Sequence, residues 1–345
     1  MALNSTETIA FKLELPIRPS LSPKWLERKT QSFSSHTSQS CLFLPCSCYS
    51  SKVVLEENNG GVDDKIQGMF VFGSSLVDNG NNNFLPNSMA KASYLPYGID
   101  FPFGPSGRFT NGKNVIDLLG DQLHLPLIPA FADPSTIGIR IIHGVDYASG
   151  ASGILDDTGL LAGGVINLNQ QIRNFEEITL PGLEIEMKLY NLGGRKFVLM
   201  SVNPIGCYPM VKAIQRASNG SCNQDLNRAA RLFNAHLKSL VNDIKPKLPG
   251  SYLVFVNSYK IIADIIKNPV SKGFEDTSNA CCEVGSEGGT LCKRDGKICE
   301  ERSSHVFFDG LHPTEAVNIL IATKAFNSID KTEIYPMNIK QLAMY

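Results

Sequence analysis

The sequence has little of several features that mark common classes of protein. Its 345 residues contain no apolar run near the roughly 18 to 20 residues that a membrane helix needs. Lys and Arg number 32 and Asp and Glu number 33, so the basic excess typical of nucleic-acid binders is missing. Neither a Gly-rich phosphate loop nor a cluster of metal-ligating residues stands out. We therefore expect a protein that does not span a membrane, binds no nucleic acid, and needs neither a cofactor nor a metal.

The N-terminal 67 residues differ in composition from the rest of the chain. The first 50 residues hold 14 Ser or Thr and the only tryptophan, Trp25, without a sustained apolar period. The apolar stretch 41–46 is short and far from Met1 for a secretory signal core, and scattered acidic residues weaken a transit-peptide interpretation. We predict an irregular leader and linker over residues 1–67 and one domain over residues 68–345.

Short apolar segments alternate with amphipathic segments from residue 68 onward. Buried strands are predicted at residues 69–73, 139–142 with 145–148, 196–202 and 252–257. Helical spacing predicts a helix that begins after Asn223 or Asp225 and ends at Pro246, and a second helix that starts near Pro313. Alternating strands and helices predict a parallel sheet with helices on both faces, which is a three-layer α/β/α fold.

Two motifs place catalytic residue types at the ends of predicted strands. Ser75 follows the first predicted strand, at the sheet edge where α/β proteins bind ligands. Asp309 and His312 lie three residues apart at a junction of strand and helix, where the carboxylate can orient an imidazole that takes the serine proton. If these residues are not catalytic, Ser75 is explained as a helix cap, and Asp309 as a cap beside a partly exposed histidine.

A third segment, residues 144–153, runs from a predicted strand into small residues. Unobstructed backbone N–H groups there are what an oxyanion hole requires. Taken alone, the segment is better explained as a tight turn that needs glycine.

Together these segments resemble the GDSL esterase/lipase family, the plant branch of the SGNH hydrolases. The resemblance covers about Gly68 to Phe326 and rests on four blocks in order: Phe-Gly-Ser-Ser-Leu-Val-Asp-Asn-Gly-Asn-Asn-Asn, Tyr-Ala-Ser-Gly, Ser-Val-Asn-Pro-Ile-Gly-Cys-Tyr-Pro and Phe-Phe-Asp-Gly-Leu-His-Pro-Thr. It implies a flavodoxin-like sheet and a serine esterase or lipase that hydrolyses carboxylic esters, including lipid or other small acyl esters.

The resemblance also implies the roles of individual residues. Ser75 would be the nucleophile, His312 the general base and Asp309 the residue that orients it. The backbone N–H groups of Ser75 and Gly150 would form the oxyanion hole. A loop at residues 102–112 would border the substrate cleft.

The sequence departs from the family pattern in two places. Ser74 stands where the family usually has aspartate before the nucleophile. The strand that ends in a Gly-x-Asn-Asp block is missing before residue 196, and the only Asn-Asp pair, Asn242-Asp243, lies in a predicted helix. We therefore expect a sheet one strand short, in which one side of the strand before Ser75 is poorly paired or filled by a segment foreign to the family.

That missing block carries an asparagine that donates to the oxyanion in the family. Loss of one such donor lowers the rate by about 10²–10³-fold. The alternatives to an active esterase are therefore an impaired or inactive binding protein that keeps the pocket, or a truncated isoform, which could also fail to fold stably.

Nine cysteines are present, three of them in the leader. The six in the predicted domain are Cys207, Cys222, Cys281, Cys282, Cys292 and Cys299. An even number favours disulfides over a zinc site or free thiols, with Cys207 and Cys222 as the natural local pair. A sequon at Asn219-Gly220-Ser221 and the family resemblance favour an extracellular location, with a plastid or intracellular location as the alternative.

Overall fold

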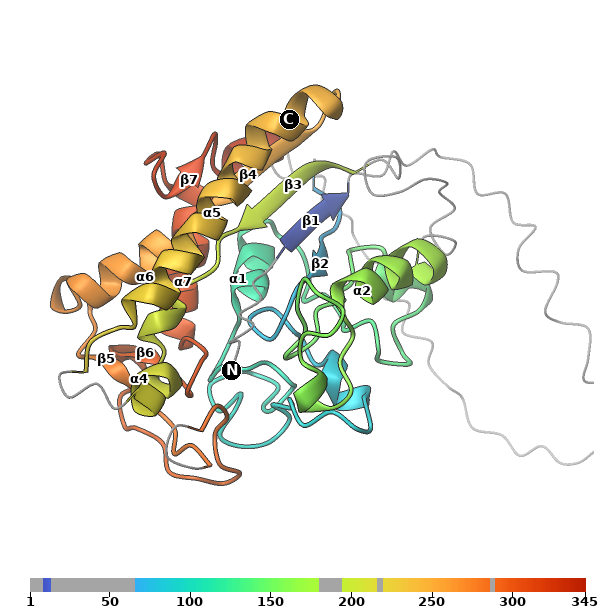
Figure 1. Cartoon of the computed structure of the whole chain (residues 1–345). Helices are drawn as coiled ribbons and strands as arrows, with labels where there is room; N and C mark the ends of the chain where they lie inside the picture. The colour runs from blue at the N-terminus through green and yellow to red at the C-terminus, as the bar shows by residue number, and fades with distance from the viewer. Residues whose placement is uncertain (1–8, 14–65, 180–193, 216–219, 286–288) are drawn as a thin grey trace, which may run out of the picture. The chain divides into compact units, whose positions relative to one another are not determined.

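The computed structural model describes residues 9–13, 66–179, 194–215, 220–285 and 289–345. The chain divides into residues 1–15 with 62–345 and residues 16–61, and all described residues belong to the first unit. At the centre of this unit is a five-stranded sheet of order β2-β1-β3-β4-β7 (Figure 1). Its strands are β1 Ile9–Leu13, β2 Phe70–Phe72, β3 Gly194–Met200, β4 Tyr252–Val256 and β7 Ile334–Tyr335.

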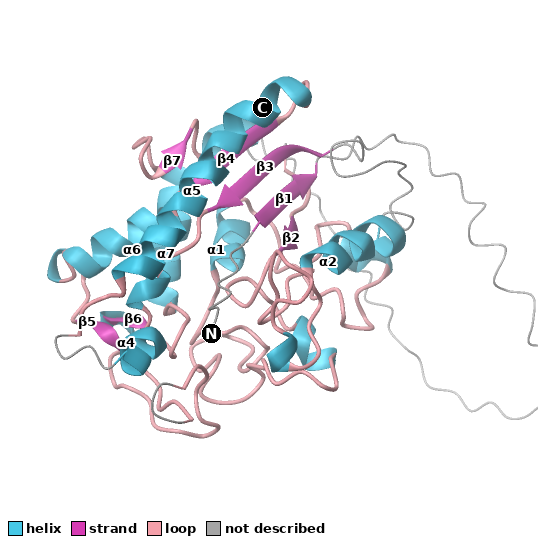
Figure 2. Cartoon of the chain, viewed as in Figure 1, coloured by secondary structure: helices cyan, strands magenta, loops and turns pink. Residues whose placement is uncertain are grey.

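Helices lie beside the sheet, and long loops connect the elements near the carboxyl end of β3 (Figure 2). The α-helices described are α1 Val115–Gln122, α2 Leu168–Asn174, α4 Pro209–Gln215, α5 Gln224–Ile244, α6 Ser258–Lys267, α7 Glu315–Asn327 and α8 Ile339–Met344. A second, parallel pair of strands consists of β5 Asp276–Ala280 and β6 His305–Phe307.

The predicted three-layer α/β/α fold is confirmed by the packing of β3. Successive side chains of a strand point to opposite faces of the sheet. Val198 and Met200 pack in one core with residues of α1, α6 and α7. Phe197 and Leu199 pack in another core with Val241 of α5. Helices therefore cover both faces of the sheet.

The sheet is mixed, whereas the sequence predicts a parallel one. Strands β3 and β4 are parallel, as expected, with Phe197 opposite Leu253. Strand β7 is antiparallel to β4, and β1 is antiparallel to both β2 and β3. These antiparallel strands enter the sheet without the crossover helix that a parallel neighbour requires.

Strand β1 occupies the place beside the strand that leads to Ser75. Ile9 pairs with Phe72 of β2 on one side, and Phe11 pairs with Phe197 of β3 on the other. The sequence predicts an irregular leader over residues 1–67, and the structure differs from that prediction at Ile9–Leu13. A segment from the leader thus fills the gap, which is one of the two outcomes expected from the missing strand. Its pairing satisfies backbone groups of β2 and β3 that would otherwise lack partners.

The other side of β2 pairs with the predicted strand 145–148. The N–H of Val71 donates to Val145 O at 3.0 Å, and the N–H of Tyr147 donates to Val71 O at 2.8 Å. Residues 139–142, in contrast, form no strand. A 3₁₀ turn over Gly138–Ile141 stands there, and Ile139 is 79% exposed. A short apolar run is ambiguous when periodicity is the only guide.

Both predicted helices are confirmed. The side chain of Asn223 accepts a hydrogen bond from the Leu226 N–H at 2.9 Å, and α5 ends at Ile244, two residues before Pro246. Helix α7 begins at Glu315.

The six cysteines of the domain form three disulfides. They are Cys207–Cys222, Cys281–Cys299 and Cys282–Cys292. The expected local pair is therefore confirmed, and these cysteines are neither free thiols nor zinc ligands. Asn219 of the sequon and the leader cysteines lie outside the described residues.

Candidate active site

Ser75 lies in the turn directly after β2. The N–H of Val77 donates to Ser74 O at 3.1 Å, which closes a turn of the chain over the nucleophile position. Ser74 is buried and Ser75 is half-buried, so the second serine is the one that reaches the surface. The end of the strand thus presents the Ser75 hydroxyl at the edge of the sheet.

The structure brings Ser75, Asp309 and His312 together. His312 Nε2 lies 2.7 Å from Ser75 Oγ, although 237 positions separate the two residues in the chain. The other ring nitrogen, Nδ1, lies 2.7 Å from Asp309 Oδ2. Asp309 is fully buried and His312 nearly so. A hydroxyl, an imidazole and a carboxylate in this order can carry out proton transfer and nucleophilic attack.

The Asp309 carboxylate is held by more donors than His312 alone. Its Oδ1 accepts the backbone N–H groups of Leu311 and His312, each at 2.8 Å. The hydroxyl of Tyr97 donates to Oδ2 at 2.6 Å and itself accepts the Cys292 N–H at 3.0 Å. Burial, followed by the negative charge of Asp309, raises the pKa of Tyr97 well above its usual value, so the hydroxyl stays a donor. No local sequence pattern indicates this role of Tyr97.

The loop predicted to border the cleft does contact the histidine. The ring of Phe109 lies 5.0 Å from the His312 ring, centroid to centroid. Thr110 Oγ1 donates to the carbonyl of Pro313 at 3.0 Å. The loop therefore packs against the histidine and its neighbour in the chain, and helps to hold the imidazole in place.

The predicted oxyanion-hole role of Gly150 is not supported by its geometry. Its N–H donates to Asp78 Oδ2 at 2.8 Å, so the donor is already used by a buried carboxyl group. A Cβ here would lie 2.7 Å from the Phe109 ring, which explains the glycine by close packing instead. In the described ranges, the N–H groups of Ser75 and Ala151 donate no hydrogen bond.

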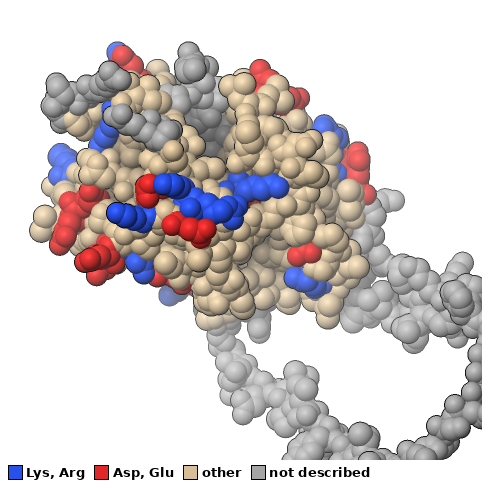
Figure 3. All heavy atoms as spheres, turned by 90° about the horizontal axis from the view of Figure 1, so that it is seen from below, with Lys and Arg blue, Asp and Glu red and all other residues tan. Residues whose placement is uncertain are grey.

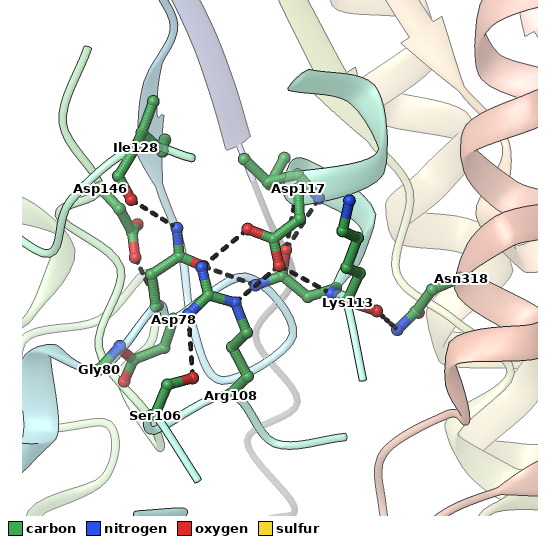
Figure 4. Close-up of polar contacts among 12 residues, drawn as sticks. Asp78, Gly80, Ser106, Arg108, Lys113, Asp117, Ile128, Asp146 and Asn318 are labelled. Atoms are coloured by element: carbon green, nitrogen blue, oxygen red, sulfur yellow. Dashed lines mark hydrogen bonds and ion pairs between the residues drawn. The ribbon is translucent and has the colours of Figure 1, made fainter. Parts of the chain in front are cut away.

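Asp78, which accepts the Gly150 N–H, is buried together with a second carboxyl group, Asp146 (Figure 4). Burial raises the pKa of Asp78 to about 6, although backbone hydrogen bonds and the positive charge of Arg108 oppose the shift. Burial and then the charge of Asp78 raise the pKa of Asp146 well above its usual value. The two groups connect the loop after Ser75 to the segment around Gly150, because Asp146 Oδ2 accepts the Asn79 N–H at 2.6 Å.

A buried ion pair adjoins these carboxyl groups. Arg108 donates from Nε to Asp117 Oδ2 at 2.6 Å and from Nη2 to Oδ1 at 2.8 Å (Figure 4). Its Nη1 donates to Ser106 Oγ at 3.0 Å. This bidentate ion pair connects the loop that contacts His312 to the start of α1.

Replacing Asp78 by asparagine should change how stability depends on pH. The folded-state pKa of Asp78 is raised from 3.8 to about 6, so its stabilising contribution is lost as the pH rises through this window. At about 1.4 kcal/mol per pKa unit, the free energy of unfolding of the parent, relative to Asp78→Asn, should fall by roughly 2 kcal/mol between about pH 4 and about pH 7. Urea unfolding of the parent and of Asp78→Asn at both pH values measures this change. If the free energies of unfolding of the two proteins differed by the same amount at both pH values, the raised pKa of Asp78 would be contradicted.

One group of residue types that bind metals lies close together in the described part of the chain. Cys281, Cys299 and His305 lie close enough to hold an ion, but the two cysteines are joined in a disulfide and offer no thiolate. No helix in the described part of the chain has the length and apolar character to cross a membrane. On the face shown in Figure 3, basic and acidic side chains lie close together and most of the surface is uncharged.

A serine, a histidine and an aspartate hydrogen-bonded in this order at the edge of an α/β sheet form the arrangement that serine hydrolases use. Residues 167–325 match the family model described as GDSL-like Lipase/Acylhydrolase. GDSL esterase/lipase At5g08460 of Arabidopsis thaliana is 39% identical, with 80% of this chain and 87% of the relative covered. GDSL esterase/lipase At4g16230 of the same plant is 37% identical, with 81% and 91% covered. The chain belongs to the GDSL esterase/lipase family and is a carboxylic ester hydrolase.

The alignment with At5g08460 is longer than the part of this chain that it covers. It extends over 336 positions, whereas 80% of 345 residues is about 276, so about 60 positions of the relative have no counterpart here. That length suffices for the expected strand, its Gly-x-Asn-Asp block and part of a helix.

Proposed function

We propose that the protein hydrolyses carboxylic esters through an acyl-Ser75 intermediate. The observation that carries the proposal is the continuous hydrogen-bonded series from Ser75 Oγ through His312 to Asp309. His312 Nε2 takes the proton from Ser75 Oγ as the oxygen attacks the ester carbonyl. Asp309 holds the imidazole in place and stabilises the positive charge that forms on it.

The tetrahedral intermediate then collapses, and His312 passes its proton to the departing alcohol. A water molecule gives a proton to His312 and attacks the acyl group, and a second collapse returns the proton to Ser75 and releases the carboxylic acid. The residues of this chain supply both proton transfers, so the cycle needs no cofactor.

The oxyanion is bound in this proposal by the N–H groups of Ser75 and Ala151. The turn that carries Ala151 lies beside the nucleophile turn, since the Ser149 N–H donates to Gly73 O at 3.1 Å. The asparagine of the Gly-x-Asn-Asp block is absent from the sequence. Because one missing donor lowers the rate by about 10²–10³-fold, we expect slower turnover than in a relative that keeps it.

In this proposal the substrate is an ester of a lipid or another small acyl compound, and the location is extracellular. Three disulfides support an oxidising compartment, because such bonds are rare in reducing ones.

A fluorophosphonate probe tests the nucleophile. Labelling of the parent and of Ser74→Ala, with loss of labelling and of p-nitrophenyl acetate hydrolysis in Ser75→Ala, is the expected result. Ser74 is the matched control because it is the adjacent serine and is buried. Label that maps by mass spectrometry to any other serine would refute the assignment.

A second candidate is a binding protein that retains the pocket without turnover. It is favoured by the missing oxyanion asparagine and by the roughly 60 unmatched alignment positions. A cooperative thermal transition without labelling of the parent would support this function. A broad transition without labelling would point to a product that does not fold stably.

A further inference from the structure

We infer that Gln171 is a positioning residue for the oxyanion hole. It fixes the relative position of the two halves of that hole, which are the Ser75 N–H group and the Ala151 N–H group. The inference rests on the proposed function, because it concerns the N–H groups of Ser75 and Ala151. Gln171 itself touches neither the serine hydroxyl nor the histidine in the contacts described, and it acts through the backbone.

The first half is held through Gly73, two residues before the nucleophile. Gln171 is fully buried, and its Oε1 accepts the Gly73 N–H at 2.9 Å. Its Nε2 donates to the Gly73 carbonyl at 2.9 Å. One side-chain amide therefore satisfies both backbone polar groups of Gly73, as a neighbouring strand would, and fixes the peptide planes that lead into Ser75.

The second half is held through Ser152. The Gln171 Nε2 lies 3.2 Å from Ser152 Oγ, which in turn donates to the Gly73 carbonyl at 2.9 Å. The Ser152 N–H also donates to Ser149 O at 3.0 Å and closes the turn that carries Ala151. Gln171, Ser152 and Gly73 thus form a closed triangle between the two turns.

Helix α2 places Gln171 firmly in this position. At its N-terminus, the Asn167 side chain accepts the Gln170 N–H at 2.8 Å, and Gln171 Nε2 donates to Ile166 O at 2.8 Å. Just beyond its C-terminus, the ring of Phe175 lies 5.0 Å from that of Phe70 in β2. Because the helix is anchored at both ends, the amide is presented to Gly73 with little freedom.

Only an amide serves both sides of this arrangement. Leucine offers neither a donor nor an acceptor, and an ionised glutamate keeps the acceptor for Gly73 N–H but loses the donors to two carbonyls. Loss of these bonds lets the Ser75 and Ala151 donors move relative to each other. Misplacement by about 1 Å can lower catalysis by about 10²-fold, and an interaction made in the transition state changes kcat more than KM.

The test compares Gln171→Leu and Gln171→Glu with Gln170→Leu. Gln170 is a matched control because it precedes Gln171 in the same helix and donates to Asn174 Oδ1 at 2.7 Å, away from the nucleophile. We expect kcat for p-nitrophenyl acetate and the rate of fluorophosphonate labelling to fall by about 10²-fold in Gln171→Leu, with KM nearly unchanged. Thermal unfolding of each variant establishes an assay temperature at which all of them are fully folded.

The pH profile separates positioning from general damage. In Gln171→Glu, protonation of the carboxyl restores one donor, so the ratio of its kcat to that of the parent should rise as the pH falls. In Gln171→Leu the ratio should stay constant. A purely structural role predicts no such difference between two folded variants.

Three results would overturn the inference. They are parental kcat in folded Gln171→Leu, a change confined to KM, and loss of the folded state in both Gln171 variants, which would make the residue structural. Failure of the parent to label at Ser75 is a different result, because it removes the proposed function together with this role. A parent that labels, with Gln171 variants that label equally fast, removes this inference alone.

Discussion

Replacement of His312 by alanine is expected to lower kcat for p-nitrophenyl acetate by at least about 10⁴-fold. The variant removes the only group within hydrogen-bond distance of Ser75 Oγ among the described residues, at 2.7 Å. Without it, the hydroxyl has no base to take its proton and the leaving alcohol has no acid. Initial rates at saturating substrate and fluorophosphonate labelling measure the loss.

His305→Ala is the control for this experiment. His305 lies in β6, and its Nδ1 contacts the carbonyl of Glu301 at 3.0 Å, away from the serine. The control should retain the parental rate. If His312→Ala kept more than about a tenth of the parental kcat, the assignment of the general base would be wrong.

Proline at position 10 is expected to destabilise the protein by about 3 kcal/mol or more. Ala10 pairs with Val71 of β2 and Val198 of β3, so it stands at the centre of a strand with neighbours on both sides. Proline removes an N–H from this ladder and places its ring against the adjacent chain. Strand β2 ends two residues before Ser74, so labelling of Ser75 should be lost together with the fold.

Ala10→Ser controls for the change of side chain, because it keeps the N–H with a small side chain. Urea unfolding followed by circular dichroism should give a midpoint near that of the parent for Ala10→Ser and a much lower one for Ala10→Pro. Equal midpoints for the two variants would show that β1 does not contribute to the folded state in solution.

Features with a local signature could be predicted from the sequence. Helices α5 and α7 are visible in the spacing of apolar residues and in their capping or stop signals, and the pair Cys207–Cys222 in a short separation. Ser75 and the pair Asp309 and His312 stand at the ends of predicted strands, and the geometry of an α/β sheet brings such ends to one edge. The resemblance in four ordered blocks adds the roles to these positions.

Features that depend on distant partners could not be predicted. Residues 9–13 become a strand because β2 and β3 leave backbone groups to pair with. Ile9, Phe11 and Leu13 alternate with Ala10 and Lys12, but an alternation over five residues does not show which strands the segment would join. Residues 139–142 have a strand-like composition but lie in and next to a 3₁₀ turn, where Ile141 is buried and Ile139 and Ile142 are exposed.

The amino-acid sequence by itself determined the layered fold and the family and singled out Ser75, His312 and Asp309 as candidates, because each of these depends on periodicity or on a contiguous motif. Only the tertiary structure decided that the Gly150 N–H faces Asp78, that Tyr97 donates to Asp309, and that Gln171 holds Gly73. Hydrogen-bond direction depends on the orientation of peptides and side chains that packing brings together, and residues 98 and 212 positions apart leave no trace of such contacts in a single chain.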